Sequence, residues 1–109
     1  MPIIYLEKID ELDKLIKENQ YLVLDFYADW CGPCKKIGEL LGKLELDEKY
    51  KEVIFCKIDA DNPDFQSLCE KYEVETLPKL VYYQNSNIID SVSTSNENII
   101  KNTLEFLLL

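Results

Sequence analysis

Residues 21–34 read Tyr-Leu-Val-Leu-Asp-Phe-Tyr-Ala-Asp-Trp-Cys-Gly-Pro-Cys, an apolar run that leads into a Cys-x-x-Cys motif. The run Tyr21–Ala28 predicts a strand buried on both faces, and Pro33 fits the first position of a helix that follows. The turn would place Cys31 at the helix N-terminus, where unpaired backbone N–H groups and the helix dipole favour a thiolate. Cys34 would lie one turn further along. This layout predicts thiol–disulfide exchange, because the first sulfur is activated and the second can close a disulfide with it.

The chain has 109 residues, the size of one compact domain, so residues 1–109 are expected to form a single domain. Its formal net charge of −9, without a basic cluster, argues against nucleic acid or an anionic membrane as a partner. No apolar run approaches the ~20 residues of a membrane span. The N-terminus shows no targeting segment. We therefore expect a cytoplasmic monomer, in a reducing compartment that suits isolated thiols.

Strand-like and helix-like segments alternate along the chain, without repeats or a flexible linker. Hydrophobic patterns predict strands at Ile3–Leu6, Tyr21–Ala28, Val53–Asp59, Leu80–Tyr83 and Ile88–Val92. They predict helices at residues 10–19, 34–50, 64–72 and 96–108. The last two strands are expected to pair as a hairpin across residues 85–87, where asparagine tolerates positive φ angles. The alternation favours a layered α/β domain.

Asp25 interrupts the apolar run between Leu24 and Phe26. A carboxylate among such neighbours should be desolvated, which raises its pKa. Asp25 is therefore a candidate general acid/base for Cys34, acting through a water molecule. The alternative is a solvent-exposed aspartate at the end of a strand, which the apolar neighbours disfavour.

A Cys-x-x-Cys motif also occurs in structural disulfides and in zinc sites. A disulfide across two intervening residues constrains little chain entropy, so a purely structural crosslink is the weaker interpretation. Cys56 and Cys69 do not form a second Cys-x-x-Cys, and we interpret them as core residues rather than zinc ligands. The chain has no histidine, which excludes Cys–His protease chemistry and histidine-ligated metals. We expect no metal and no bound cofactor.

Four features together resemble the thioredoxin family over nearly the whole chain. They are the order of the elements, the run Trp30–Lys35, Asp25 upstream of this run, and Leu77-Pro78 before a later strand. A bare Cys-x-x-Cys would be a weak signal, whereas the flanked motif is specific. The resemblance implies the thioredoxin fold, a central mixed sheet of about five strands flanked by about four helices.

The resemblance also implies a protein-disulfide reductase. Cys31 would attack a target disulfide to form a mixed disulfide, and Cys34 would then attack Cys31 and release the reduced target. Asp25 would move the proton during this second step. The product would be a redox-active Cys31–Cys34 disulfide, which a flavin-containing thioredoxin reductase would reduce again. Oxidised protein substrates and this reductase are the expected partners.

Five positions are expected to bind the substrate, namely Trp30, Gly32, Pro33, Leu77 and Pro78. Gly32 would let a target backbone approach the sulfur. The resemblance implies a cis Leu77–Pro78 peptide, which would bring Leu77 backbone groups beside the reactive cysteine. From the residues alone, a trans proline that opens a strand and a tryptophan buried in the core remain as alternatives.

Four positions depart from the family pattern. Relatives have a helix-kinking proline where this chain has Glu39, a threonine where it has Lys79, a groove glycine where it has Thr94, and often a tryptophan where it has Tyr27. Lys79 is expected to add a cation to the substrate-facing strand, and Tyr27 is interpreted as packing. The departures leave target specificity open, so two alternatives stand: a dedicated redox partner of one enzyme, or a thioredoxin-like partner-binding module with incidental redox activity.

Overall fold

Five strands form one mixed sheet, in the order β1-β3-β2-β4-β5, in the computed structural model, which describes residues 3–109. The strands are β1 (Ile4–Tyr5), β2 (Tyr21–Tyr27), β3 (Val53–Asp59), β4 (Lys79–Gln84) and β5 (Asn87–Ser93). Strands β1, β3 and β2 run parallel, while β4 is antiparallel to β2 and β5 is antiparallel to β4. The predicted mixed sheet is confirmed, and the bounds of β3 match the predicted strand.

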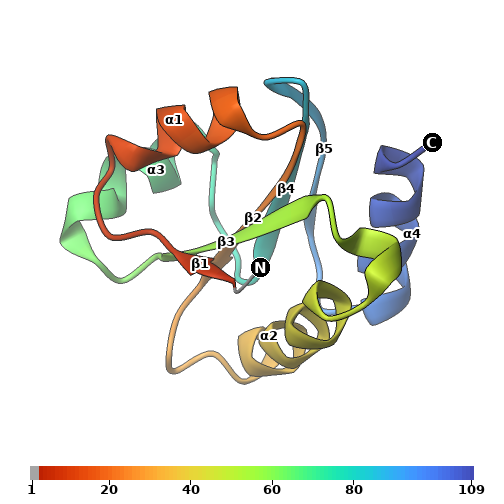
Figure 1. Cartoon of the computed structure of the whole chain (residues 1–109). Coiled ribbons are helices and arrows are strands. Elements are labelled where there is room, and N and C mark those ends of the chain that lie inside the picture. Colours follow the sequence, from red (N-terminus) through yellow and green to blue (C-terminus); the bar gives the residue numbers. More distant parts are fainter. Residues whose placement is uncertain (1–2) are drawn as a thin grey trace.

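Four α-helices cover the two faces of this sheet (Figure 1). They are α1 (Glu11–Glu18), α2 (Gly32–Glu45), α3 (Gln66–Lys71) and α4 (Glu97–Leu107). Helices α1 and α3 pack on one face, and α2 and α4 pack on the other (Figure 1). Within residues 3–109, no helix is long and apolar enough to cross a membrane.

Two predicted helices divide into shorter pieces. The segment expected at residues 34–50 is α2 followed by the 3₁₀ helix η1 (Glu48–Tyr50), which begins where the Asp47 carboxylate accepts the Lys49 backbone N–H. The segment expected at residues 64–72 is the 3₁₀ helix η2 (Pro63–Phe65) followed by α3. Side-chain caps of this kind start a new helical turn, and periodicity alone does not locate them.

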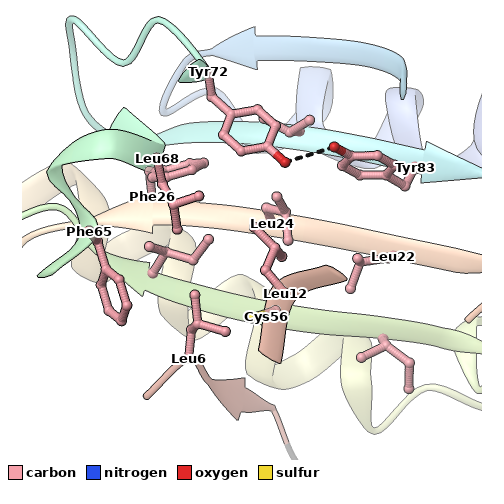
Figure 2. Close-up of a cluster of buried hydrophobic side chains, with 13 residues drawn as sticks. Leu6, Leu12, Leu22, Leu24, Phe26, Cys56, Phe65, Leu68, Tyr72 and Tyr83 are labelled. Carbon is pink, nitrogen blue, oxygen red and sulfur yellow. Dashed lines mark hydrogen bonds between the residues drawn. The ribbon is translucent and has the colours of Figure 1, made fainter. Parts of the chain in front are cut away.

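Strand β2 is the centre of the core and is buried on both faces, as predicted. Leu22, Leu24 and Phe26 point into the cluster shown in Figure 2, where they meet side chains of α1 and α3. The hydroxyl groups of Tyr72 and Tyr83 are hydrogen-bonded at 2.8 Å in this cluster, which satisfies two buried polar groups (Figure 2). The alternate residues of β2, including Asp25, face α2 and α4, so the only buried acidic side chain of this strand lies on the same side as the Cys-x-x-Cys helix.

The predicted hairpin is confirmed between β4 and β5. Gln84 pairs with Asn87, so the turn consists of two residues, Asn85 and Ser86. Their φ angles are 51° and 68°, which is the pattern of a type I′ turn.

Candidate active site

Cys31 is the N-cap of α2 and follows directly after the end of β2. Its sulfur forms a disulfide with Cys34 and accepts a hydrogen bond from the Cys34 backbone N–H at 3.2 Å. The helix begins at Gly32, so Pro33 occupies the second helical position rather than the predicted first. Proline is tolerated there for the same reason, since N–H groups of the first turn have no helical partner. After reduction, the same N–H and the helix dipole would stabilise a Cys31 thiolate.

Cys31 lies in the wall of a surface groove of about 440 Å³. The residue itself is only 5% exposed. The groove is bordered by Trp30 on one side and by residues 74–77 on the other. A target disulfide would therefore have to enter the groove to reach the sulfur.

Two of the five predicted substrate-binding positions, Trp30 and Leu77, line this groove. The Leu77–Pro78 peptide is cis, as the resemblance implied, and the Leu77 carbonyl oxygen lies 3.9 Å from the Cys31 sulfur. Trp30 is 72% exposed, which excludes the alternative of a core tryptophan. Its indole N–H donates to the Asp61 carboxylate at 2.7 Å, and this bond orients the ring at the edge of the groove.

Asp25 is fully buried, so the alternative of a solvent-exposed aspartate is wrong. Neither carboxylate oxygen has a hydrogen-bond partner within residues 3–109. Burial raises the pKa of Asp25 to about 6, although the nearby Lys57 ammonium acts in the opposite direction. A carboxyl group with this pKa can exchange protons near neutral pH.

Lys57 is a site residue that the sequence interpretation missed. Its Nζ lies 4.0 Å from Asp25 Oδ2, because Asp25 and Lys57 are paired in the β2–β3 register. A lysine within the otherwise apolar run Val53–Ile58 was the available signal. This signal could not identify Asp25 as the partner, because the register of two parallel strands cannot be predicted from either strand alone.

A small cavity of about 160 Å³ lies between Lys57 and the second cysteine. Its lining includes Cys34, Lys57, Tyr5 and Tyr27. The cavity is large enough for a few water molecules, each of which occupies about 30 Å³ in the liquid. Polar groups at its wall can hold such waters beside Cys34.

Lys79 does not face the groove, so the expectation of a substrate-facing cation is wrong. Its ammonium donates to the carbonyl oxygens of Tyr72 and Glu73, at 2.6 and 3.1 Å. These carbonyls follow the end of α3, where helix carbonyl groups lack helical partners and attract cations. The Thr94 side chain likewise makes a local hydrogen bond, because its hydroxyl oxygen accepts the Asn96 backbone N–H at 3.0 Å just before α4.

The two remaining cysteines lie in different surroundings. Cys56 is buried in the core, as predicted, and burial raises the pKa of its thiol to about 12. Cys69 is only half-buried and lines the same groove as Cys31, so its assignment to the core was incomplete.

The comparisons with known proteins agree on one family. The family model described as Thioredoxin matches residues 4–105. Thioredoxin-1 of Caenorhabditis elegans is 38% identical over 84 residues, which cover 75% of this chain and 70% of the relative. Thioredoxin of Ictalurus punctatus is 33% identical over 102 residues, which cover 91% and 92% of the two chains. The solved structure of oxidised mitochondrial thioredoxin 3 from Saccharomyces cerevisiae is similar with a TM-score of 0.85 and 33% identity, covering 95% of this chain and 94% of that chain.

Proposed function

Because the chain belongs to the thioredoxin family and is a thiol–disulfide oxidoreductase, we propose that it reduces disulfides of protein substrates with Cys31 as the nucleophile. The observation that supports this role most directly is the position of Cys31, whose sulfur caps α2 and accepts the Cys34 N–H at 3.2 Å. A thiolate there is stabilised by the same donor, while the groove leaves one direction of approach for a target.

The proposed reaction transfers two electrons from the dithiol to the target. The Cys31 thiolate attacks one target sulfur, the target disulfide breaks, and the first target thiolate leaves. Asp25 accepts the proton of the Cys34 thiol through water in the small cavity that Cys34 and Lys57 line. The Cys34 thiolate then attacks the Cys31 sulfur, which releases the second target thiolate and leaves the Cys31–Cys34 disulfide.

We propose that the target binds in the groove beside Cys31 through Trp30, Gly32, Pro33, Leu77 and Pro78. Gly32 and Pro33 are exposed, and a glycine at the helix start leaves room for a target backbone. The Leu77 backbone lies beside the sulfur and offers polar groups to an extended peptide. Trp30 adds an exposed aromatic surface of the kind that binds protein partners.

We further propose that the protein works as a single-domain monomer in the cytosol and receives its electrons from a flavin-containing thioredoxin reductase. A reducing compartment suits the two isolated thiols, Cys56 and Cys69. The net charge of −9 favours neither nucleic acid nor an anionic membrane as a partner.

Reduction of insulin with dithiothreitol as electron source tests the chemistry without assuming a reductase. We expect the natural sequence to be active, Cys31→Ser to be inactive, and the matched control Cys69→Ser to keep its activity. Cys34→Ser should accumulate a covalent mixed disulfide with its target. An inactive natural sequence that still binds a partner tightly would instead support the partner-binding module, and activity on one protein but not on insulin would support the dedicated redox partner.

A further inference from the structure

Lys57 is enclosed by aromatic rings from two neighbouring strands. Its Nζ lies 4.5 Å from the ring centroid of Tyr27 in β2 and 5.7 Å from that of Tyr5 in β1. Both distances are within the range of cation–π attraction. The two rings pack edge to face, with their centroids 6.4 Å apart. Since the lysine side chain is only 11% exposed, little water competes with the rings for the ammonium.

Helix α2 closes a third side of the ammonium at Gly38. A Cβ atom at this position would lie 2.9 Å from Lys57 Nζ, which is closer than such atoms approach one another. A methyl group here would therefore displace the ammonium, and this shift costs little because Nζ is the far end of a flexible side chain. Gly42 lies one turn further along the same helix, and a Cβ there would meet no neighbouring atom within 4 Å.

No hydrogen bond between Lys57 and Asp25 fixes the ammonium. The 4.0 Å separation is too long for one, and within residues 3–109 neither Asp25 oxygen has any other hydrogen-bond partner. A lysine ammonium is strongly hydrated on a flexible stem, so it tends to move toward water when it is not held. The surrounding groups must supply the restraint.

We propose that Tyr5, Tyr27 and the bare backbone at Gly38 form a cation cage, which positions the Lys57 ammonium beside Asp25 and thereby controls proton transfer to and from Cys34. The proposal rests on the role given to Asp25 under the proposed function. The two tyrosines and Gly38 are positioning residues, because they act on the reaction through Lys57. Tyr27 then has a role beyond packing. The cage also explains why Tyr5, which is 59% exposed on an edge strand, is aromatic, since its ring attracts the Lys57 ammonium.

Other ionisable groups also face this pair and must be separated from it in any titration. They are Asp29 before α2, Cys34 and Lys35 in α2, Asp59 in β3 and Tyr82 in β4, while Cys56 interacts with Asp25 from the opposite face of the sheet. In the oxidised protein Cys34 does not titrate, because it is part of the disulfide. Residue-specific carbon-13 NMR signals of the carboxyl groups distinguish Asp25 from Asp29 and Asp59.

The test is the pKa of Asp25 in the oxidised protein, followed by carboxyl carbon-13 NMR, which needs no activity. Tyr5→Leu and Tyr27→Leu remove the attraction of the rings, so the ammonium should move away and the pKa of Asp25 should rise by about half a pH unit or more. The matched variants Tyr5→Phe and Tyr27→Phe keep the aromatic faces and should leave this pKa unchanged. Leucine and phenylalanine variants that titrate alike would overturn the proposal.

A double-variant cycle shows whether the tyrosines act through Lys57. Lys57→Met alone should raise the pKa of Asp25 by about one pH unit or more, because an opposite charge within reach is lost. In the Lys57→Met background, Tyr27→Leu should cause no further change. A persisting effect would mean that the ring acts on Asp25 directly, which contradicts the cage.

Gly38→Ala and Gly42→Ala are a matched pair on the same helix. Both raise helix propensity equally, but only the methyl group at position 38 contacts the ammonium. We expect Gly38→Ala to shift the pKa of Asp25 and the pH profile of target release, and Gly42→Ala to change neither. Equal behaviour of the two variants would remove Gly38 from the cage. An unchanged pKa of Asp25 in the variants would overturn the cage even if the protein reduces insulin. A failure to reduce insulin, by contrast, would contradict the proposed function and would not affect the NMR result.

Discussion

The Asp25 carboxylate and the Lys57 ammonium lie 4.0 Å apart at paired positions of two adjacent parallel strands. Their attraction offsets only part of the desolvation of a fully buried carboxyl group, because the pKa of Asp25 is still raised to about 6. The lysine thus lowers the pKa of this carboxyl group and keeps more of it ionised at neutral pH. Asp25 therefore changes its charge near neutral pH, where the Cys34 thiol needs a base to accept its proton.

We predict that Asp25 makes the protein less stable as pH rises. Its pKa is 3.8 in the unfolded reference and about 6 in the folded protein, so the folded state binds the proton more tightly. The stabilisation is fully present below pH 3.8 and is lost as pH rises through 6. A difference of roughly two pH units corresponds to about 3 kcal/mol in the free energy of unfolding. Urea unfolding of the oxidised protein at pH 4 and pH 8 should show this loss, and Asp25→Asn should lack it; equal pH dependence in both proteins would contradict the prediction.

The same variant should separate the two steps of exchange. Attack by Cys31 does not use Asp25, whereas resolution requires the Cys34 thiol to lose its proton. Since general-base catalysis contributes about 100-fold or more, Asp25→Asn should slow release of the mixed disulfide by about that factor and barely affect its formation. Trp30, the single tryptophan, borders the groove and serves as the stopped-flow fluorescence probe. Release that is as fast in the variant as in the parent would remove Asp25 from the reaction.

Local patterns explain why much of the site could be predicted from the sequence. The apolar run before Cys31 marked a strand buried on both faces, and its position before a proline marked a helix start. Burial of Asp25 followed from its two apolar neighbours in the same strand. Each of these features depends on residues adjacent in sequence, so its physical cause lies within the same short segment of the chain.

Contacts across the sheet could not be predicted in the same way. Lys57 reaches Asp25 through strand register, and Tyr5 reaches Lys57 from a strand of only two residues. The direction of Lys79 depends on where α3 ends in space rather than on its own strand. Cys69 lies on α3, which follows a short 3₁₀ turn, and it lines the groove. Side-chain direction in these cases is decided by tertiary placement, which hydrophobic periodicity does not encode.

Lys79→Met should reduce stability without affecting catalysis. The substitution keeps most of the apolar stem and removes the ammonium that donates to the Tyr72 and Glu73 carbonyl oxygens. Loss of these hydrogen bonds should cost about 1 kcal/mol in the free energy of unfolding, measured in urea. The rate of insulin reduction should be unchanged, because Lys79 does not line the groove beside Cys31. Lys43→Met, at an exposed lysine of α2, is the control; a lower rate in Lys79→Met alone would restore the substrate-facing role.

The surroundings of three of the four thiols predict their order of alkylation in the reduced protein. Cys31 caps α2 and borders the groove, so a larger share of it should be thiolate at pH 7 than in an ordinary thiol. Burial raises the pKa of Cys69, and it raises that of Cys56 to about 12. Iodoacetamide, followed by mass spectrometry, should therefore label Cys31 about tenfold faster than Cys69, and Cys56 only after unfolding. Cys31→Ser provides the control for peptide assignment. Labelling of Cys69 at the rate of Cys31 would show that groove exposure, rather than the helix cap, determines thiol reactivity in this protein.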